Sequence, residues 1–224
     1  MHNNVDQFHP LTQEDLIKGE KQIASLDEQH QELVRCVGQC TLKPQTAREP
    51  YEGLIHALTY QRLSDSAGDA ILGRLCQHFH KKSFPSVQEL LSLDTEDLRS
   101  FGFSHRKGET ILELANMAAD GSLPSREEIS HMPLDKMIGI FTKVKGIGAW
   151  TVEKYAIFTL GRPNVMPTMD REIRENVQLL YHLDHTPTDV EMEERSRAYV
   201  PYKTVASWYL WRVPELIVER NQKM

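Results

Sequence analysis

Apolar residues recur at three- and four-residue spacing along almost the whole chain, and the alternating apolar–polar pattern of exposed strands is absent. This spacing places apolar side chains on one face of a helix. Asp94 or Thr95 is expected to begin one helix and Gly121 to end another, because these residue types favour helix caps. The pattern predicts helices at 11–23, 28–37, 51–60, 65–79, 86–91, 95–101, 106–120, 125–131, 137–141 and 152–160. We therefore predict an all-α protein of about ten helices joined by short loops.

Size and composition narrow the class of protein. The chain has 224 residues and a net charge of −6 at pH 7, enough length for a sizeable core. No stretch approaches about 18 apolar residues, so we expect no membrane helix. Residues 1–7 are polar and lack a signal-peptide pattern, which favours a protein that is not secreted. Residues 44–50, with a proline at each end, are expected to link an N-terminal arm to the main body.

The turn Lys145-Gly146-Ile147-Gly148 lies between two predicted helices, 137–141 and 152–160. Glycine permits left-handed backbone angles, and amide N–H groups at the start of a helix bind anions. Residues 136–176 carry seven basic side chains against four acidic ones, whereas 184–194 is strongly acidic. The turn therefore suits a nucleic-acid phosphate on a local basic strip, with few phosphates neutralised. The alternative is an ordinary helix–helix connection.

Four blocks in this order resemble the HhH-GPD superfamily of helix-hairpin-helix DNA glycosylases, specifically the 3-methyladenine DNA glycosylase II branch (bacterial AlkA-like and yeast Mag-type enzymes). The blocks are residues 54–64, residues 102–107, the hairpin 144–150 with Asp170, and residues 202–212 with their Ala-x-Trp-Tyr-Leu-Trp-Arg ending. The resemblance implies a two-lobed helical fold with the hairpin at the cleft between lobes. It suggests one lobe at 51–183, and a second formed by 8–50 with 184–224.

The resemblance implies that Asp170 is the catalytic residue. Cleavage of the bond between sugar and base gives the sugar positive charge, which a carboxylate stabilises, or the carboxylate aligns the attacking water. Asp170 also precedes a helical pattern and suits the role of a helix N-cap, and one residue could serve both roles. Bifunctional relatives carry an attacking lysine where this chain has Trp150. The resemblance therefore implies a monofunctional enzyme that leaves the strand uncut.

The base pocket that the resemblance implies is aromatic, formed by Trp150, Trp211 and Tyr155. A flat indole binds an extruded, cationic base well, although Trp150 could instead be a core residue. Trp208, Tyr209 and Trp211 could likewise all belong to the core. Lys154, one turn beyond Trp150, is expected to point outward toward phosphate. Met169 stands before Asp170, where relatives commonly have a second Asp.

The block Gln61-Arg62-Leu63-Ser64 is similar to the family's wedge loop, which fills the gap left by a flipped base. Arg62 stands at the plug position, where Gln or Leu is more usual, and Leu63 would press the opposite strand. Arg62 could instead be only a surface phosphate contact. The residues expected to contact the DNA backbone are Lys143, Lys145, Gly146, Gly148 and Thr151. Family hairpins often hold Na⁺ or K⁺ by backbone carbonyls, here near Val144, without side-chain ligands.

The resemblance thus implies a monofunctional hydrolase that excises alkylated purines such as 3-methyladenine and 7-methylguanine from double-stranded DNA. We expect a monomer without an obligatory cofactor, in the nucleus if eukaryotic and otherwise in the cytoplasm. The C-terminal four-cysteine cluster site of some glycosylase relatives is absent, so we expect no iron–sulfur cluster. Cys36, Cys40 and Cys76, with the nearby histidines, lack zinc-finger spacing. One alternative is a protein of the same fold that binds damaged or abasic DNA without excision, or with only weak excision. Another is a DNA-tethered interaction scaffold.

Overall fold

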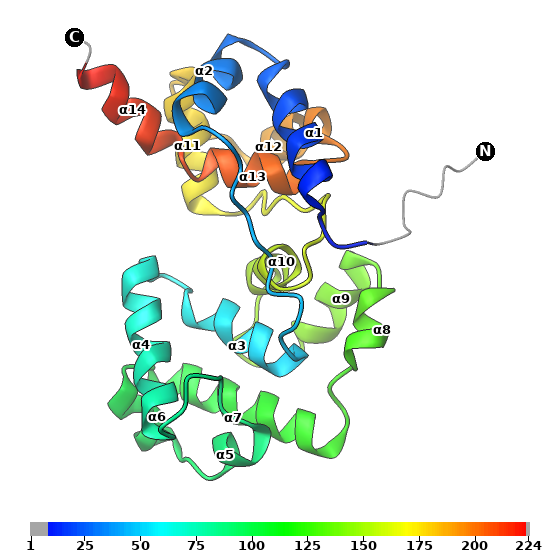
Figure 1. Cartoon of the computed structure of the whole chain (residues 1–224), viewed down its shortest axis with the longest axis vertical. Helices are drawn as coiled ribbons and strands as arrows, with labels where there is room; N and C mark the ends of the chain where they lie inside the picture. The colour runs from blue at the N-terminus through cyan, green and yellow to red at the C-terminus, as the bar shows by residue number, and fades with distance from the viewer. Residues whose placement is uncertain (1–8, 223–224) are drawn as a thin grey trace. The chain divides into compact units, whose positions relative to one another are not determined.

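The computed structural model describes residues 9–222, and these residues form fourteen α-helices, one short 3₁₀ helix and no strand (Figure 1). The helices are α1 (Gln13–Ala24), α2 (Glu28–Val37), α3 (Pro50–Thr59), α4 (Asp65–His78), α5 (Val87–Leu91), α6 (Thr95–Phe101), α7 (His105–Asp120), α8 (Arg126–Ser130), α9 (Leu134–Phe141), α10 (Ala149–Phe158), α11 (Arg171–Tyr181), α12 (Asp189–Ser196), η1 (Arg197–Tyr199), α13 (Lys203–Leu210) and α14 (Val213–Gln222). The prediction of an all-α protein is confirmed.

The ten helices predicted from apolar spacing correspond to α1 through α10. The expected count of about ten was too low, because residues 171–222 add four further helices. Asp94 caps α6 by accepting hydrogen bonds from the amides of Glu96 and Asp97. Gly121 ends α7 in the left-handed conformation, with φ +78°. Both predicted caps are confirmed.

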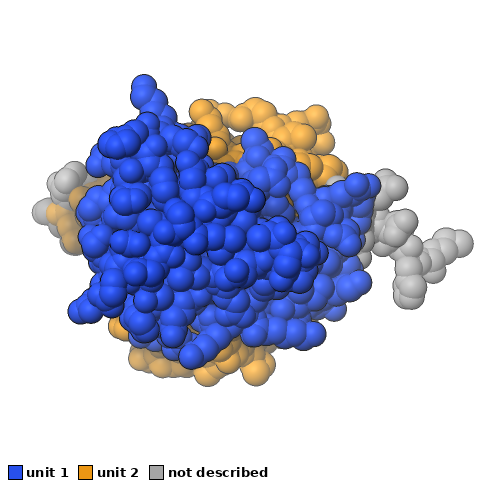
Figure 2. All heavy atoms as spheres, turned by 90° about the horizontal axis from the view of Figure 1, so that it is seen from below, with its two compact units in different colours: residues 1–8, 47–155 blue, residues 9–46, 156–224 orange. Residues whose placement is uncertain are grey.

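The chain divides into two compact units, coloured separately in Figure 2. Among the described residues, unit 1 comprises 47–155 and unit 2 comprises 9–46 with 156–222. The division at 46/47 falls inside the predicted linker 44–50. The other boundary corrects the expected lobe 51–183: it falls after Tyr155, because α11 packs on α13 and α14 of unit 2. Residues 1–7, where no signal peptide is expected, lie outside the described part of the chain.

Unit 1 is built around α7, the longest helix, which contacts α3, α5 and α6. The apolar face of α7 contributes Ile111 and Leu114 to a core that also contains Leu54, Leu58 and Leu98. Burial of such side chains stabilises a fold by about 1.5–3 kcal/mol each. This core fixes the positions of the loops that connect α3 to α4 and α9 to α10.

Unit 2 is built around α13, which packs against α1, α2 and α11. Seven consecutive residues of α13, Thr204–Leu210, are buried, so this helix is covered on all sides. Helix α14 packs against α2 and α11. Among the described residues, no helix is both long and apolar enough to cross a bilayer.

Candidate functional site

The hairpin 144–148 connects α9 to α10 in unit 1. The side chains of Val144 and Ile147 are buried, and the Ile147 N–H donates to the Val144 carbonyl at 3.1 Å. Gly146 has φ +99°, and a Cβ at this position would collide with Thr110 Oγ1 of α7. Glycine is therefore required for both its backbone angle and its lack of a side chain. The turn is anchored by its apolar residues and leaves Gly148 exposed at the head of α10.

The exposed side of the hairpin has the chemistry of an anion site. Helix α10 begins at Ala149, three residues earlier than predicted, so the exposed Gly148 and Ala149 lie at its N-terminus. The first amides of a helix have no intrahelical acceptor and carry partial positive charge. Lys143 and Lys145 are exposed on the same turn. These groups together suit a phosphate.

Thr151 does not fit the predicted contact with the DNA backbone. Its side chain is fully buried, and its Oγ1 accepts a hydrogen bond from Gln61 Nε2 at 2.5 Å. Gln61 Nε2 also donates to the Gly146 carbonyl at 3.2 Å. The Gln61 side chain thus points inward to the hairpin, which differs from the wedge position expected for it.

The Arg62 turn, defined as residues 60–64, joins α3 to α4. The Leu63 N–H donates to the Tyr60 carbonyl at 3.1 Å, and Ser64 Oγ caps α4 by accepting from the Ala67 N–H. Arg62 has φ +59°, a left-handed conformation uncommon for a residue other than glycine. Both Arg62 and Leu63 are exposed. Of the four predicted wedge residues, Ser64 is exposed too but uses its hydroxyl to cap α4, so Arg62 and Leu63 are the two exposed side chains that this turn does not use for capping.

Two residues of α7 hold these loops, and sequence reasoning gave neither a role. Lys107 Nζ donates to the carbonyls of Thr59 at 2.7 Å and Gln61 at 3.0 Å. Thr110 Oγ1, one turn later, donates to the Lys145 carbonyl at 2.8 Å. Burial lowers the pKa of Lys107. A signal was present in the sequence, because Lys107 falls on the same helical face as the apolar Ile111 and Leu114.

Trp150 lies in the first turn of α10, half-buried, and Lys154 Nζ is 5.3 Å from the centroid of its ring. This cation–π contact corrects the expectation that Lys154 points away toward phosphate. Tyr155 is 1% exposed and contacts Phe141 edge-on, with ring centroids 6.2 Å apart. Tyr155 is therefore a core residue of unit 1, which differs from the pocket role expected for it.

Asp170 stands in unit 2 at the head of α11 and is 5% exposed. Its Oδ1 accepts a hydrogen bond from the Ile173 N–H at 3.0 Å, so the N-cap role is confirmed. A carboxylate has a second oxygen, so capping does not exclude a role in chemistry. The preceding residue, Met169, is 59% exposed.

Helix α13 holds the segment that leads to Asp170. Thr204 Oγ1 donates to the Arg162 carbonyl at 2.5 Å and accepts from the Val165 N–H at 3.1 Å. Ser207 Oγ donates to the Val165 carbonyl at 3.3 Å. Both hydroxyls are buried. The fourth sequence block is thus joined by hydrogen bonds to residues 162–165, which precede Asp170 in unit 2.

The fourth block also supplies Trp211, which follows α13. Trp211 is half-buried and its ring centroid lies 5.7 Å from that of Phe158, with the planes 31° apart. Trp208 and Tyr209 are buried core residues, and the Arg212 guanidinium lies over the Trp208 ring. Of the three aromatic residues in the Trp-Tyr-Leu-Trp ending of this block, Trp211 is the one whose partial exposure suits contact with a ligand.

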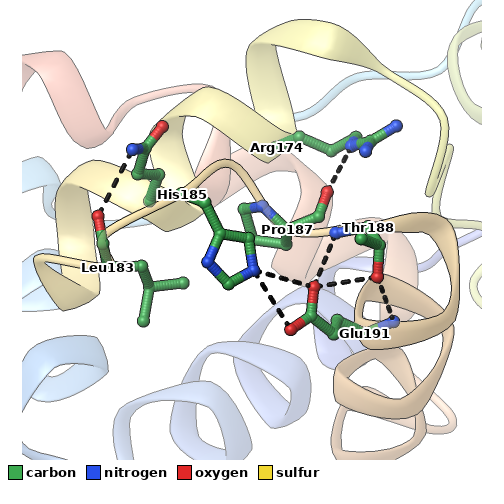
Figure 3. A network of polar contacts seen from close by, with 7 residues as sticks. Arg174, Leu183, His185, Pro187, Thr188 and Glu191 are labelled. Atoms are coloured by element: carbon green, nitrogen blue, oxygen red, sulfur yellow. Dashed lines mark hydrogen bonds and ion pairs between the residues drawn. The ribbon is translucent and has the colours of Figure 1, made fainter.

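A network of polar contacts fixes the connection from α11 to α12 (Figure 3). Arg174 Nε donates to the Pro187 carbonyl at 2.7 Å. Glu191 accepts hydrogen bonds from the Thr188 amide and hydroxyl, which lower its pKa to about 2, with help from His185. Glu191, one of the acidic residues in 184–194, therefore stabilises the loop between α11 and α12.

The described residues contain no group of three or more His, Cys, Asp or Glu side chains placed to bind a metal ion. Three hairpin carbonyls, those of Val144, Lys145 and Gly146, accept hydrogen bonds from Ile147, Thr110 and Gln61 respectively. The cation expected at the hairpin stays a prediction.

Comparison with known proteins gives one family and a set of close relatives. Residues 55–201 match the model of the HhH-GPD superfamily base excision DNA repair protein. The alkylbase DNA glycosidase-like protein mag2 of Schizosaccharomyces pombe is 37% identical, covering 90% of this chain and 95% of the relative. The DNA-3-methyladenine glycosylase 1 of the same yeast is 36% identical, covering 90% and 89%.

A solved structure of the S. pombe 3-methyladenine DNA glycosylase, Mag1, in complex with abasic DNA superimposes with a TM-score of 0.81. It is 36% identical, and the match covers 87% of this chain and 95% of that one. The helical fold, the glycine hairpin and the family match agree, and this chain belongs to the HhH-GPD superfamily of base excision DNA repair proteins.

Proposed function

We propose that this protein is a monofunctional DNA glycosylase that hydrolyses the bond between deoxyribose and an alkylated purine, such as 3-methyladenine or 7-methylguanine. The observation that carries the proposal is Asp170, a nearly buried carboxylate that α13 and α11 hold in place. Two relatives that match about 90% of this chain are named for alkylated-base or 3-methyladenine glycosylase chemistry, which supports this substrate class.

Binding would begin at the hairpin. The amides at the head of α10, with Lys143 and Lys145, would hold a phosphate of double-stranded DNA. Arg62 and Leu63 would enter the stack as a nucleotide turns out, because the gap must be filled. The Arg62 guanidinium can also donate hydrogen bonds to the orphaned base.

Cleavage would follow at the everted nucleotide. Trp150 and Trp211 would contact the base, whose positive charge after alkylation favours an aromatic face. As the bond from C1′ to the base nitrogen breaks, its electron pair leaves with the base, and Asp170 stabilises the charge on the sugar. Water adds to C1′ and gives up a proton, for which Asp170 is the candidate acceptor. Trp150 offers no amine, so no Schiff base forms and the strand stays intact.

A second candidate function is recognition of damaged or abasic DNA with weak excision or none. Lys154 favours it, because an ammonium group over the Trp150 ring would repel a cationic base and occupies the ring's attractive face. The solved relative in complex with abasic DNA shows that a close homologue forms such complexes.

The same proposal extends to cellular context. We propose a monomer that works on double-stranded DNA, in the nucleus if the cell is eukaryotic and otherwise in the cytoplasm. It would need no iron–sulfur cluster, because the chain has three cysteines where a four-cysteine site needs four. Na⁺ or K⁺ at the hairpin carbonyls near Val144 would assist phosphate binding without taking part in cleavage.

The test is release of 3-methyladenine and 7-methylguanine from methylated duplex DNA under single-turnover conditions, with the S. pombe DNA-3-methyladenine glycosylase 1 as positive control. Asp170→Asn keeps a residue that caps helices well, so the fold should persist. We expect release to fall at least about 100-fold while binding to an abasic-site analogue changes little. Wild-type protein that binds the analogue tightly but releases no base would establish the second candidate. Release by Asp170→Asn close to wild type would leave Asp170 a helix cap only.

A further inference from the structure

The Arg62 turn is held from three sides within unit 1. On one side the Tyr60 ring covers Gly68, where any Cβ would collide with it, and its hydroxyl bonds to Asp69. On another, Gln61 Nε2 reaches the hairpin. On the third, Lys107 Nζ donates to the carbonyls of Thr59 and Gln61. A surface turn whose only task was to connect two helices would not need three anchors.

Of these three contacts, the one made by Lys107 requires partial burial of a charged group. Its ammonium group is partly buried, and burial disfavours a charged amine. The charge is compensated by the Thr59 carbonyl at the C-terminal end of α3, where the helix dipole is negative, and by the Gln61 carbonyl of the Arg62 turn. A lysine in this place therefore fixes the path of the chain between α3 and the Arg62 turn.

The same face of α7 also holds the hairpin, because Thr110 bonds to the Lys145 carbonyl one turn beyond Lys107. Residues three apart on a helix lie side by side. Gln61 completes the connection by bonding to both the hairpin and Thr151. One rigid helix thus sets the spacing between the loop that carries Arg62 and the turn that suits a phosphate.

We infer that Lys107 is a positioning residue for DNA distortion: it holds the Arg62 turn in register with the hairpin, so that Arg62 and Leu63 enter the duplex where the phosphate is held. This inference rests on the DNA binding common to both candidate functions. Lys107 acts through Arg62, and we assign it no contact with substrate.

The test compares Lys107→Met, which keeps length and removes the donors, with Lys107→Arg, which keeps a charged donor. Lys82→Met, an exposed lysine of the same unit, controls for the loss of one positive charge. We measure affinity for duplexes with and without an abasic-site analogue, and the fluorescence of 2-aminopurine beside that site, which reports unstacking. Lys107→Met should lose about tenfold in preference for the abasic site and most of the fluorescence change. Undamaged-DNA affinity should stay within twofold, Lys107→Arg should recover part of the loss, and Lys82→Met should match wild type.

A double-mutant cycle with Arg62→Ala separates positioning from general weakening of the fold. If Lys107 acts by positioning Arg62 and Leu63, the double variant should lose clearly less than the sum of the two single losses. Additive losses, or equal losses on undamaged DNA, would overturn the inference. The base-release assay on the same proteins keeps the two proposals distinct. If wild type releases no base but Lys107→Met still loses preference for the abasic site, only the proposal of glycosylase activity is rejected. If wild type releases base but Lys107→Met binds like wild type, only the positioning role of Lys107 is rejected.

Discussion

In each unit, a helix uses side-chain hydrogen bonds to hold an irregular segment that carries a candidate functional residue. In unit 1, Lys107 of α7 donates to the Gln61 carbonyl of the Arg62 turn, and Thr110 donates to the Lys145 carbonyl of the hairpin. In unit 2, Thr204 and Ser207 of α13 bind the segment that leads to Asp170. The two arrangements differ in what they expose. The turn in unit 1 presents Arg62 to solvent, whereas Asp170 is nearly buried.

This difference suits the two tasks. A residue that must enter DNA has to project from the surface, so it tolerates backbone strain and few contacts of its own. A carboxylate that must stabilise developing charge works best where water is scarce and its position is fixed. Burial makes its supports more important, because a buried polar group that loses its partner costs far more than an exposed one. The following predictions test this contrast.

Removal of the Thr204 hydroxyl should have the largest effect on stability. Thr204→Val keeps the shape but leaves the Val165 N–H and the Arg162 carbonyl without this partner in a fully buried place. We expect a loss of about 2–3 kcal/mol in the free energy of unfolding, measured in urea, and slower base release.

The matched variant in unit 1 is Thr110→Val, whose hydroxyl bonds to the carbonyls of Arg106 and Lys145. Thr110 is itself buried, but its bond reaches a carbonyl of the exposed hairpin, where we expect water to replace the lost donor, so the loss should be smaller, about 1 kcal/mol. Equal losses at the two threonines would break the contrast between a buried and an exposed functional segment.

Two histidines whose pKa values are lowered by burial give a further effect on stability, through pH. Burial, aided by the Arg48 guanidinium, lowers the pKa of His56 in unit 1 to about 3. As the pH falls below about 6.5, the unfolded chain therefore binds a proton that the folded chain refuses, and folded stability declines by up to about 1.4 kcal/mol per pH unit. Unfolding in urea at pH 7, 6 and 5 should show this slope in wild type and a flatter one in His56→Gln.

His30 in unit 2 provides the comparison. Burial lowers its pKa too, but the Asp27 carboxylate opposes that shift by bonding to Nδ1 at 2.8 Å. His30→Gln should therefore flatten the slope less than His56→Gln. If His30→Gln flattens the dependence of the unfolding free energy on pH more than His56→Gln does, the bonds of His30 to Asp27 and Tyr199 do not offset the effect of burial on its pKa.

The local structure could be predicted from the sequence where short-range chemistry decides it. Helix positions follow from apolar spacing, Asp94 and Gly121 from capping preferences, and the hairpin from its glycines. Asp170 as an N-cap follows from the same reasoning. The family resemblance then supplied the roles of these residues.

What the sequence could not supply depends on contacts between distant segments. Gln61 stands next to Arg62 in a loop, yet it points inward because Gly146 and Thr151 offer it partners 85 and 90 residues away. Tyr155 and Trp150 share a helix, but Tyr155 faces the core because α10 packs it against Phe141 of α9. The expected boundary between the units differs from the observed one for the same reason, because α11 joins unit 2 through tertiary packing on α13 and α14.

Lys154, a half-buried cation of unit 1, tests whether a positive charge beside Trp150 helps or hinders base release. Lys154→Met removes the charge over the Trp150 ring, a half-buried contact of about 0.5–2 kcal/mol. Release of cationic 7-methylguanine should rise about two- to fivefold, because the ring face becomes free and the repulsion ends. Release of neutral hypoxanthine should stay unchanged wherever it can be detected. A fall for both bases, together with weaker binding to undamaged DNA, would instead make Lys154 a phosphate contact.

The smallest effect concerns the backbone of the Arg62 turn. Arg62→Gly and Arg62→Ala remove the same functional side chain, but only glycine adopts φ +59° without steric cost. Relief of about 1 kcal/mol of strain is partly offset by the greater freedom of glycine in the unfolded chain. Arg62→Gly should therefore be more stable to urea than Arg62→Ala by about 0.5 kcal/mol, while both lose the same preference for abasic DNA. If Arg62→Ala is the more stable of the two, the left-handed conformation of Arg62 carries no strain. The exposed turn of unit 1 would then lack the backbone strain that distinguishes it from the buried, well-supported Asp170 of unit 2.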